Sequence, residues 1–378
     1  MALFGPNELS ADVLEEGLCV GCGACIHLCP YFATHRGKTA MLFPCSAETG
    51  RCHAYCPKTE VDLDAIARDC SGEDYTGEPM GFFRAVHAAR AAQKDPAGNF
   101  QDGGTVSALM RFALETGVID AAVLTGQQAG IPAPGITTRP DAVDAFASSK
   151  YAAAPTLSAL NDGARRGFTR MGVVGTPCQM TALAQMRLNP TRMENYVHPV
   201  SLSIGLFCTW ALDARVFAAL AADRAGTPDI RKIRIPPPPA GVVVIETDAG
   251  SVEIPIDEIR ALVLAGCSVC PDMTAEWADV SVGALEGADG WNTLIVRTEA
   301  GENLVREAVE AGRIITVALP DNAMAQLKNA AAAKKGRALE KARREGRINT
   351  DPGENRRSVL RVNTGALEKI LSGKGKAI

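Results

Sequence analysis

From residue 82 onward, the spacing of apolar residues predicts alternating helices and strands. Short apolar runs typical of buried strands occupy residues 121–126, 171–175, 200–207, 241–247 and 293–298. Helices are predicted over 82–93 and over 105–117, where apolar residues at 106, 109, 110 and 113 share one face and Gly117 marks the C-terminus. The prolines at 236–239 predict a stiff, extended connection. This alternation is typical of an α/β domain.

Composition places the chain among soluble globular proteins. It has 378 residues, of which 47% are hydrophobic and 22% charged, and a net charge of −4. This length allows two or three domains, and the apolar content excludes disorder throughout. No apolar run approaches the roughly 18 to 20 residues that cross a bilayer, and the start MALFGPNELSADVLEEG carries no basic leader. We therefore expect a cytoplasmic protein without a membrane span.

Charge is distributed unevenly along the chain. Residues 321–378 contain 14 lysines and arginines against 6 acidic residues, so this segment carries a net charge of +8 and the preceding residues carry −12. The pattern predicts a solvated helix rich in Ala, Lys and Arg with a partly disordered end, or a segment that docks on a partner. Nucleic-acid binding is disfavoured because no aromatic residues are interleaved with the basic ones.

Twelve cysteines are the feature of composition that points to chemistry. Eight lie within the first 70 residues and four lie far downstream. Their share of the chain is below the roughly 8 to 10% of a short disulfide scaffold, and the cytoplasm keeps thiols reduced. Metal or redox sites are therefore the better hypothesis, and the two groups of cysteines predict two separate sites.

The first group contains the sequence CVGCGACIHLCP at residues 19–30. Its spacing, C-x2-C-x2-C-x3-C-P, is that of bacterial ferredoxins, in which three thiolates hold one cubane and the fourth reaches another. Gly21 and Gly23 suit the tight curl that such a loop needs. Zinc normally takes four ligands in paired C-x2-C knuckles, so this spacing disfavours a zinc site.

The second half of the N-terminal segment, PCSAETGRCHAYCP, widens the first gap but again ends in C-x3-C-P. The crossing rule of two-cluster ferredoxins predicts two ligand sets. The first set is Cys19, Cys22, Cys25 and Cys56, and the second is Cys29, Cys45 and Cys52. The three-ligand set is similar to that of seven-iron ferredoxins, which hold a [3Fe–4S] cluster. Cys70 either supplies a fourth ligand for a [4Fe–4S] cluster or is a free surface thiol.

The downstream cysteines lie at predicted strand ends and in one tight turn. Cys178 occurs in VVGTPCQM, Cys208 in IGLFCTW, and Cys267 and Cys270 in GCSVCPD. Placed in this way, the four thiols can converge on one site. Taken alone, they are also compatible with buried packing residues, and the C-x2-C pair with zinc or a redox dithiol.

Several segments over residues 80–312 resemble, in the same order, the beta subunits of coenzyme F420 hydrogenases and dehydrogenases. This family also includes 7-hydroxymethyl chlorophyll a reductase, and many members carry an N-terminal ferredoxin-type segment. The segments are QDGGTVSALMRFALETGVID, SSKYAAAP, VVGTPCQM, IGLFC, CSVCPD and ADVSVGALEGADGWNTLIVRTEAG. Each is short, and their shared order makes the resemblance specific.

The resemblance implies an FAD-containing electron-transfer subunit with a [4Fe–4S] cluster close to the flavin. Its ligands would be Cys178, Cys208, Cys267 and Cys270. Gly103, Gly104 and Thr105 open a predicted helix whose N–H groups would approach the FAD pyrophosphate, although this pattern is also that of an ordinary turn and cap. Ser149, Lys150 and Tyr151 match a segment that would bring a cation near the flavin. Trp291 and Arg297 match family positions as well, with packing and ion pairing as alternatives.

The sequence thus predicts an α+β protein with a dicluster ferredoxin-like segment over 1–70, an α/β FAD and [4Fe–4S] domain over 80–320, and a basic, mostly helical extension over 321–378. Residues 71–79 form the expected linker. Two or three [4Fe–4S] clusters are expected, with one [3Fe–4S] cluster as the alternative for the three-ligand set. Because FAD and the clusters perform the chemistry, no catalytic side chain is assigned.

Two functions follow from this prediction. In the first, FAD exchanges hydride with coenzyme F420 or a similar carrier and passes single electrons through the clusters to a hydrogenase, formate dehydrogenase or heterodisulfide-reductase-like complex. In the second, the chain only relays electrons between ferredoxin or a partner and that complex. NAD(P)H stays open as the donor although no G-x-G-x-x-G fingerprint follows a strand. A zinc-stabilised structural protein is the third alternative.

Overall fold

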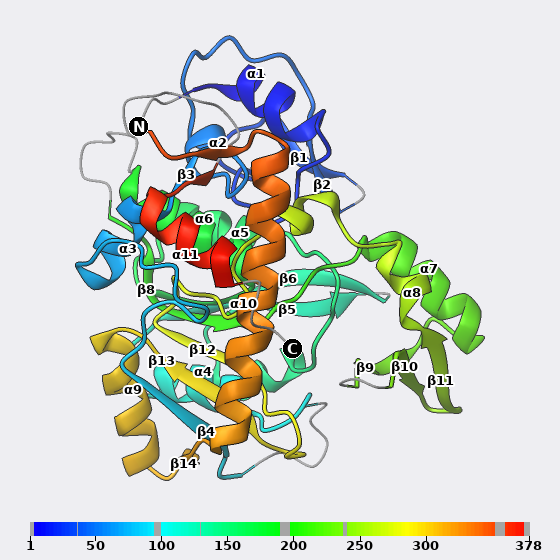
Figure 1. The fold of residues 1–378 in the computed structure, drawn as a ribbon. Coiled ribbons are helices and arrows are strands. Elements are labelled where there is room, and N and C mark those ends of the chain that lie inside the picture. The colour runs from blue at the N-terminus through cyan, green and yellow to red at the C-terminus, as the bar shows by residue number, and fades with distance from the viewer. Residues whose placement is uncertain are drawn as a thin grey trace.

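An eight-stranded mixed sheet forms the centre of the molecule (Figure 1). The computed structural model describes residues 4–35, 37–93, 100–128, 130–189, 197–236, 240–351 and 360–373. The strand order is β14 (Ile314–Ala318), β4 (Ala85–Ala91), β13 (Asn292–Val296), β12 (Val280–Ala284), β8 (Val200–Leu206), β7 (Met171–Gly175), β5 (Ala121–Gln128) and β6 (Ile131–Thr137). The four strands β12, β8, β7 and β5 run parallel, and the outer pairs are antiparallel.

Helices cover both faces of this sheet. On one face lie α5 (Thr156–Arg165) and α6 (Pro177–Leu188), and on the other lie α4 (Thr105–Glu115) and α9 (Glu299–Glu310). Val173 packs with the first pair and Val174 with the second, as the alternation of side chains along a strand requires. Strands buried on both faces are near-continuously apolar, which explains why their sequences were recognisable.

The predicted strands are confirmed at β5, β7, β8, β10 and β13, and the helix predicted at 105–117 is α4. The helix predicted over 82–93 is wrong, because residues 85–91 form β4 between β13 and β14. Alanine favours helices in isolation, but pairing on both sides and a half-buried setting outweigh that preference. The last three prolines of the run, at 237–239, lie outside the described residues.

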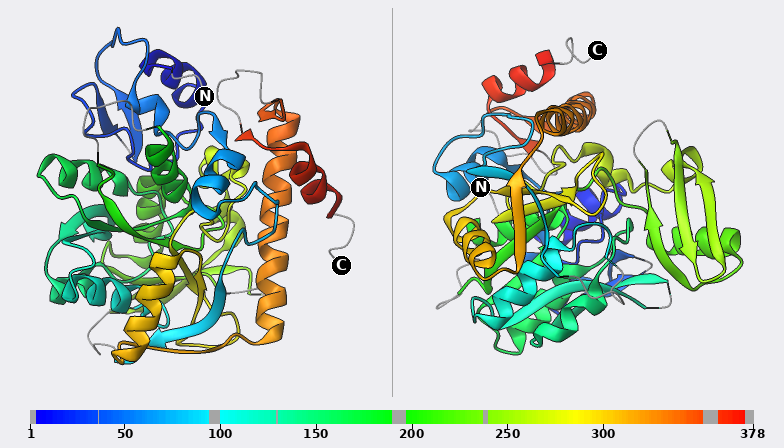
Figure 2. Two further views of the ribbon diagram at one scale, coloured as in Figure 1. Left: turned by 90° about the vertical axis from the view of Figure 1, so that its left-hand side faces the viewer. Right: turned by 90° about the horizontal axis from the view of Figure 1, so that it is seen from below.

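A small lobe projects from one side of the sheet (Figure 2). It consists of the antiparallel strands β9 (Ile230–Arg234), β10 (Val242–Thr247) and β11 (Gly250–Pro255) with the helices α7 (Ala214–Ala225) and α8 (Ile256–Arg260). Phe217 of α7 packs against Ile245 of β10 in an apolar core of the lobe's own. The lobe follows Cys208 in the chain and precedes Cys267, so its two ends lie beside the downstream cysteines.

The N-terminal segment packs directly on the body of the protein. It contains α1 (Pro6–Leu9), the π-helical turn η1 (Ser10–Leu14), β1 (Phe32–His35), β2 (Lys38–Met41), α2 (Arg51–Ala54), β3 (Val61–Asp62) and α3 (Leu63–Ser71). Val20 and Leu63 share an apolar core with Leu157 of α5 and Leu183 of α6. The expected linker is also packed, since Tyr75 and Gly77 are buried.

The C-terminal extension is helical, as predicted, but it is not a solvated appendage. The long helix α10 (Asp321–Arg344) lies along the outside of the sheet and is followed by β15 (Ile348–Asn349), β16 (Leu360–Arg361) and α11 (Thr364–Ser372) (Figures 1 and 2). Ala331 packs on Ile295 of β13, and β16 pairs with β3 of the N-terminal segment. In the described part of the chain, no helix has both the length and the apolar composition of a membrane span.

Candidate functional site

Neighbouring parallel strands place two of the downstream cysteines at one edge of the central sheet. Strand β7 ends at Gly175 and leads into α6, whose second residue is Cys178. Strand β8 ends at Leu206, two residues before Cys208. Because β7 and β8 pair in parallel, both segments leave the sheet at the same edge. The Thr176 backbone N–H donates to the Gln179 side chain over 2.8 Å and closes the cap of α6.

The turn η3 (Ala265–Val269) brings Cys267 and Cys270 to the same edge. The Ala211 N–H donates to the sulfur of Cys267 over 3.4 Å. The Cys208 N–H donates to the carbonyl of Met273 over 2.9 Å, so the two cysteine-bearing segments are hydrogen-bonded to each other. A backbone amide directed at a sulfur is the contact that a cysteine ligand of an iron–sulfur cluster uses.

The four downstream thiols influence one another electrostatically. Burial, with smaller contributions from Cys270 and Cys267, raises the pKa of Cys178 to about 12. Burial also raises the pKa values of Cys208 and Cys267, again with contributions from the other thiols. Thiolates that repel one another at close range are stabilised when a metal centre supplies positive charge. The donor set and its burial therefore fit an iron–sulfur cluster.

Two buried lysines flank this set, and the sequence pattern had assigned no role to either. The ammonium of Lys334 on α10 donates to the carbonyl oxygens of Cys208 and Asp272, at 2.6 Å each. Lys334 lowers the pKa values of Cys208 and Cys267, and Lys58 lowers those of Cys178 and Cys267. The sequence did hold a signal for Lys334. It lies on a buried helical stripe that continues through residues 331, 335, 338, 339 and 342.

The cysteines of the first N-terminal set lie close together, with Cys22 and Cys25 buried and Cys19 and Cys56 half-buried. Burial raises the pKa of Cys22 strongly, with further contributions from Cys56 and Cys25. Burial raises the pKa of Cys25 to about 12; a contact with Thr39 opposes the rise, and Cys19 adds to it. The Thr39 side-chain oxygen lies 3.2 Å from the sulfur of Cys25. The backbone N–H of Thr39 donates to the sulfur of Cys19 over 3.5 Å.

The glycines of this loop are required by close backbone approaches. Gly21 has φ +64°, and a methyl group there would collide with the carbonyl oxygen of Gly37. Gly23 has φ +85°, and a methyl group there would collide with the backbone at Pro155, at the start of α5. The two glycines thus let the cysteine loop pack closely against neighbouring backbone, at Gly37 and at Pro155.

Asn161 of α5 ties the same loop to the body. Its buried side-chain amide donates to the carbonyl oxygens of Ala24 over 3.0 Å and of Ile26 over 2.7 Å. The Leu157 N–H donates to the carbonyl of Cys22 over 3.1 Å. These bonds fix the cysteine loop relative to α5 and the central sheet.

The second N-terminal set lies next to the first. Burial raises the pKa of Cys52 to about 11, and Cys29 and then Cys45 add smaller contributions. Cys52 in turn raises the pKa of Cys25, which belongs to the first set. The two sets therefore lie side by side.

The first N-terminal set also lies next to the downstream set. Cys178 raises the pKa of Cys22. A small cavity of about 20 Å³ between them is lined by Pro57, Lys58, Cys178 and Cys270. A methyl group at Gly266, beside Cys267, would collide with the carbonyl of Leu18, beside Cys19. The three thiol sets thus form a chain with the first N-terminal set in the middle.

Cys70 lies apart from this chain of thiols. It is on α3, where the Arg187 guanidinium donates to its sulfur over 3.1 Å. Burial raises its pKa, and the charged groups that act on it are Arg187, Asp69 and Asp279, none of them a cysteine. In the described ranges, no three His, Cys, Asp or Glu side chains lie close enough to ligate a single metal ion. The ligands of a [4Fe–4S] cluster lie farther apart, because each cysteine binds a different iron.

The predicted pyrophosphate turn is held rigidly against the sheet. Gly104, with φ +73°, precedes the first residue of α4. Thr105 is fully buried, and its hydroxyl donates to the Asn292 side chain over 2.9 Å. A methyl group at Gly103 would collide with the same side chain. The Thr105 N–H also donates to the Asn292 side chain, over 3.4 Å. Gly104 contributes no side-chain cap, so the N–H groups after Thr105 are the ones that a phosphate could contact.

The structure brings the second predicted flavin segment beside this turn through Gln101. The Gln101 side chain accepts from the Ser149 N–H and donates to the Tyr151 hydroxyl, both over 3.3 Å. Tyr151 has φ +53°, an uncommon conformation for a residue with a Cβ. Lys150 donates to the carbonyl of Ala147 over 2.8 Å, and in the described part of the chain no carboxylate lies within ion-pairing distance of its ammonium.

Burial lowers the pKa of Lys150 to about 8. A half-buried cation without a carboxylate partner is the environment that a flavin with negative charge would complement. The residues present therefore fit FAD in two respects, an open helix start and an uncompensated cation.

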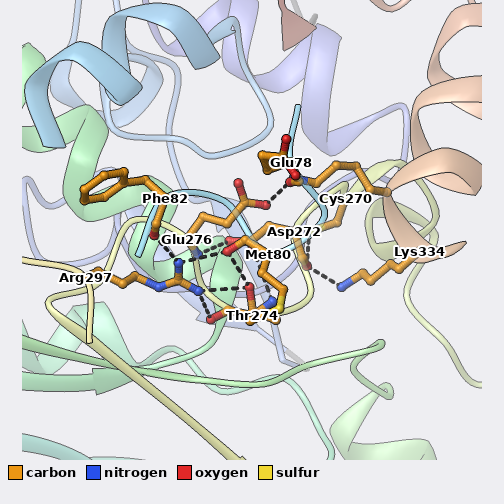
Figure 3. A network of polar contacts seen from close by, with 10 residues as sticks. Glu78, Met80, Phe82, Cys270, Asp272, Thr274, Glu276, Arg297 and Lys334 are labelled. Carbon is orange, nitrogen blue, oxygen red and sulfur yellow. Dashed lines mark hydrogen bonds and ion pairs between the residues drawn. The ribbon is translucent and has the colours of Figure 1, made fainter. Parts of the chain in front are cut away.

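Arg297 is buried, and protein groups accept its guanidinium hydrogen bonds (Figure 3). Its guanidinium is buried and donates to the carbonyls of Met80, Phe82 and Thr274 and to the side chains of Thr274 and Ser281. Arg297 thus joins the segment after the linker, at Met80 and Phe82, to Thr274, which follows Cys270 in the chain. Trp291 stacks beneath the guanidinium of Arg90, 5.1 Å from the ring centre.

Comparisons with known proteins identify relatives of this chain. Residues 86–161 match the N-terminal part of the family described as "Coenzyme F420 hydrogenase/dehydrogenase, beta subunit", and residues 168–322 match its C-terminal part. The coenzyme F420 hydrogenase subunit beta of Methanococcus voltae is 32% identical over 250 residues, which are 64% of this chain and 87% of that protein.

Two further relatives extend the similarity. One of the subunits of the F(420)H(2) dehydrogenase of Methanosarcina mazei is 29% identical over 79% of this chain and 86% of its own. A chain of the F420-reducing [NiFe] hydrogenase complex from Methanosarcina barkeri has a TM-score of 0.66 and 26% identity, covering 74% of this chain and 97% of that one. This protein therefore belongs to the family of coenzyme F420 hydrogenase/dehydrogenase beta subunits.

Proposed function

We propose that this chain is an iron–sulfur flavoprotein subunit that moves electrons between a two-electron carrier of the coenzyme F420 class and a partner redox enzyme. The observation that carries the proposal is the order of the thiol sets, with Cys52 beside Cys25 and Cys22 beside Cys178. Clusters held by neighbouring thiol sets would allow single electrons to pass from one cluster to the next, whereas widely separated metal sites would not. The family membership supplies the class of the carrier.

FAD, when bound, would accept a hydride from the carrier and release its two electrons one at a time. The protein's own residues bind and orient it. The start of α4 at Gly104 offers backbone N–H groups and the positive end of the helix dipole to the pyrophosphate. Lys150 places a positive charge in a buried position near that turn, and Gln101 holds the two segments together.

The cysteines would hold three clusters. Cys178, Cys208, Cys267 and Cys270 hold the cluster of the body, and Cys19, Cys22, Cys25 and Cys56 hold the middle one. Cys29, Cys45 and Cys52 hold the outermost one, which we propose to be [3Fe–4S] because Cys70 is paired with Arg187 on α3. The outermost set lies in the N-terminal segment, which is where a partner would exchange electrons with the chain.

The partner is proposed to be a hydrogenase, a formate dehydrogenase or a heterodisulfide-reductase-like complex. The relative from Methanosarcina barkeri is described as part of a hydrogenase complex. Proposed domains follow the same division, with the ferredoxin-type segment over 1–70, the flavin and cluster domain over 80–320, and the extension over 321–378.

The test uses the full chain purified without oxygen and loaded with FAD. Reduced F420 is added with a viologen dye as the one-electron acceptor, and the absorbance of both is followed. We expect F420 oxidation and dye reduction in a ratio of one to two. Cys178→Ser should block dye reduction, while Cys70→Ser serves as the matched control and should leave it intact.

Two results would reject parts of the proposal. Intact FAD without oxidation of reduced F420 would support the alternative relay function, with ferredoxin or the partner as electron donor. Zinc in place of iron, and no absorbance of clusters or flavin, would reject both redox functions. Iron analysis should give about eleven atoms per chain for two four-iron clusters and one three-iron cluster.

A further inference from the structure

The C-terminal helix α10 reaches the proposed cluster of the body, although it lies beyond the region that defines the family. The family match ends at residue 322, and α10 spans Asp321–Arg344. In Figure 1 the helix runs along the body of the molecule, and it packs against η3, the turn that carries Cys267. A basic segment that seemed from its charge to be peripheral therefore contacts the redox site.

Lys334 is the residue of α10 that makes this contact. Its ammonium donates to the carbonyl oxygens of Cys208 and Asp272, at 2.6 Å each, and Figure 3 shows the contact with Asp272. The residue is only 6% exposed. Cys208 lies on the segment that follows β8, and Asp272 lies two residues after Cys270. One side chain thus bridges the two segments that carry three of the four thiols.

The position of this charge has an electrostatic consequence. A [4Fe–4S] cluster gains one negative charge when it takes up an electron, and its potential depends on net charge and on the hydrogen bonds around it. A buried cation interacts more strongly with that charge than a solvated one, because little water screens it. The two carbonyl contacts do not neutralise Lys334. The Asp272 carboxylate attracts the same ammonium and offsets part of its charge, and the remainder acts on the reduced cluster.

We propose that Lys334 raises the reduction potential of the cluster held by Cys178, Cys208, Cys267 and Cys270, so that this cluster accepts electrons from the flavin. The electron comes from reduced FAD, and no proton or bond is exchanged at Lys334. It is a positioning residue that tunes the acceptor. The inference deepens the proposed function and rests on the presence of that cluster.

The test is a potentiometric titration of the purified holoprotein, followed by electron paramagnetic resonance. Lys334→Met removes the charge and the donors, Lys334→Gln removes the charge but keeps donors for both carbonyls, and Lys334→Arg keeps the charge. Lys328→Met on the exposed face of the same helix is the matched control. Cys267→Ser, which removes one ligand, identifies the transition that belongs to this cluster.

We expect Lys334→Met and Lys334→Gln each to reduce the equilibrium constant for one-electron reduction about tenfold, which lowers the midpoint potential by about 59 mV. Lys334→Arg should stay within about threefold of the unmodified protein because it keeps the charge. Lys328→Met should also stay within about threefold, because the charge it removes is exposed and screened by water. The transitions of the N-terminal clusters should move less, because Lys334 acts on Cys208, Cys267 and Cys270.

Other outcomes overturn the inference in distinguishable ways. An unchanged potential in Lys334→Gln with full iron content means that the hydrogen bonds act and the charge does not. A lowered potential in Lys334→Arg means that packing is responsible. If Cys267→Ser loses no iron and no transition, the cluster itself is absent, and the proposed function fails together with the inference.

Discussion

Lys335 of α10 and Glu276 form an ion pair in the interior, with 2.7 Å between Nζ and Oε1 and side-chain exposures of 1% and 2%. Lys335 also donates to the carbonyl of Glu78 over 2.5 Å and lies above the ring of Tyr75. These contacts join the C-terminal helix to the packed segment that follows α3. The pair therefore fixes the helix, and with it Lys334, against the redox site.

Replacing Lys335 with methionine should destabilise the protein by about 3 to 5 kcal/mol, because it leaves a carboxylate buried without its partner. The double variant Lys335→Met, Glu276→Gln should recover most of this loss. Lys341→Met, which breaks an exposed pair with Glu345 on the same helix, should cost less than about 1 kcal/mol. Chemical denaturation measures the free energy of unfolding of all three variants. A small loss of stability in Lys335→Met would show that α10 is held by its apolar face alone.

The loss of folding stability in Lys335→Met should also grow as the pH rises. Burial raises the pKa of Glu276 to about 7 even with Lys335 beside it, and removal of the lysine raises it further. In the variant, the folded state then keeps a proton that the unfolded state releases above about pH 4.5, so stability falls as the pH rises. Denaturation at pH 6 and pH 8 should show the larger loss at pH 8, whereas a constant loss would contradict a further rise in the pKa of Glu276.

Gly21→Ala should prevent the first N-terminal set from closing. The residue combines φ +64° with a backbone oxygen in the place of the new methyl group. Gly17→Ala is a matched control, because Gly17 has φ +68° and open space around its Cα. Iron analysis after reconstitution should show a loss of about four atoms per chain in Gly21→Ala, by the size of one cluster, and none in Gly17→Ala. Equal iron in both would mean that the loop can relax.

FAD affinity should fall as the pH rises past about 8. Burial places the pKa of Lys150 near 8, below its ordinary value of 10.5, so the free protein loses this charge as the pH rises past about 8. Binding of an anion favours the protonated form, and the dissociation constant should rise up to about tenfold per pH unit until the bound form also titrates. Flavin fluorescence measures the dissociation constant of FAD at each pH.

Two variants control for other effects of pH on flavin binding. Lys150→Arg should keep the affinity constant to about pH 10, because arginine stays charged. Lys150→Met should bind weakly at every pH. Affinity of the unmodified protein that does not change between about pH 7 and pH 10 would place the flavin away from Lys150.

Cys70→Ser should leave the iron content and the resonance signals of the clusters unchanged. The thiol is paired with Arg187 and has no cysteine among its charged neighbours. Loss of one iron, or conversion of a four-iron signal into a three-iron one, would instead make Cys70 the fourth ligand of the outermost set. Arg187→Gln removes the charge but keeps a side-chain amide, and it tests whether the pair has a structural role.

The cysteine spacing and the apolar strands were readable from the sequence because both are local. In C-x2-C-x2-C-x3-C-P the ligands lie within one loop, and strands such as 171–175 are apolar on both faces because helices cover both. The family resemblance was confirmed by the matches over residues 86–161 and 168–322. The error at 82–93 arose where alanine's helical preference met a place between two strands, which only the sheet decides.

Tertiary structure alone decided how the local pieces meet. The proximity of Cys22 to Cys178 depends on parallel strands ending at one edge, and the isolation of Cys70 depends on the packing of α3 against α6. Lysines 334 and 335 carry charges that, by composition, belong in solvent. They are buried because carbonyl oxygens and Glu276 lie within 2.7 Å of their ammonium groups, and no sequence pattern reveals partners so distant in the chain.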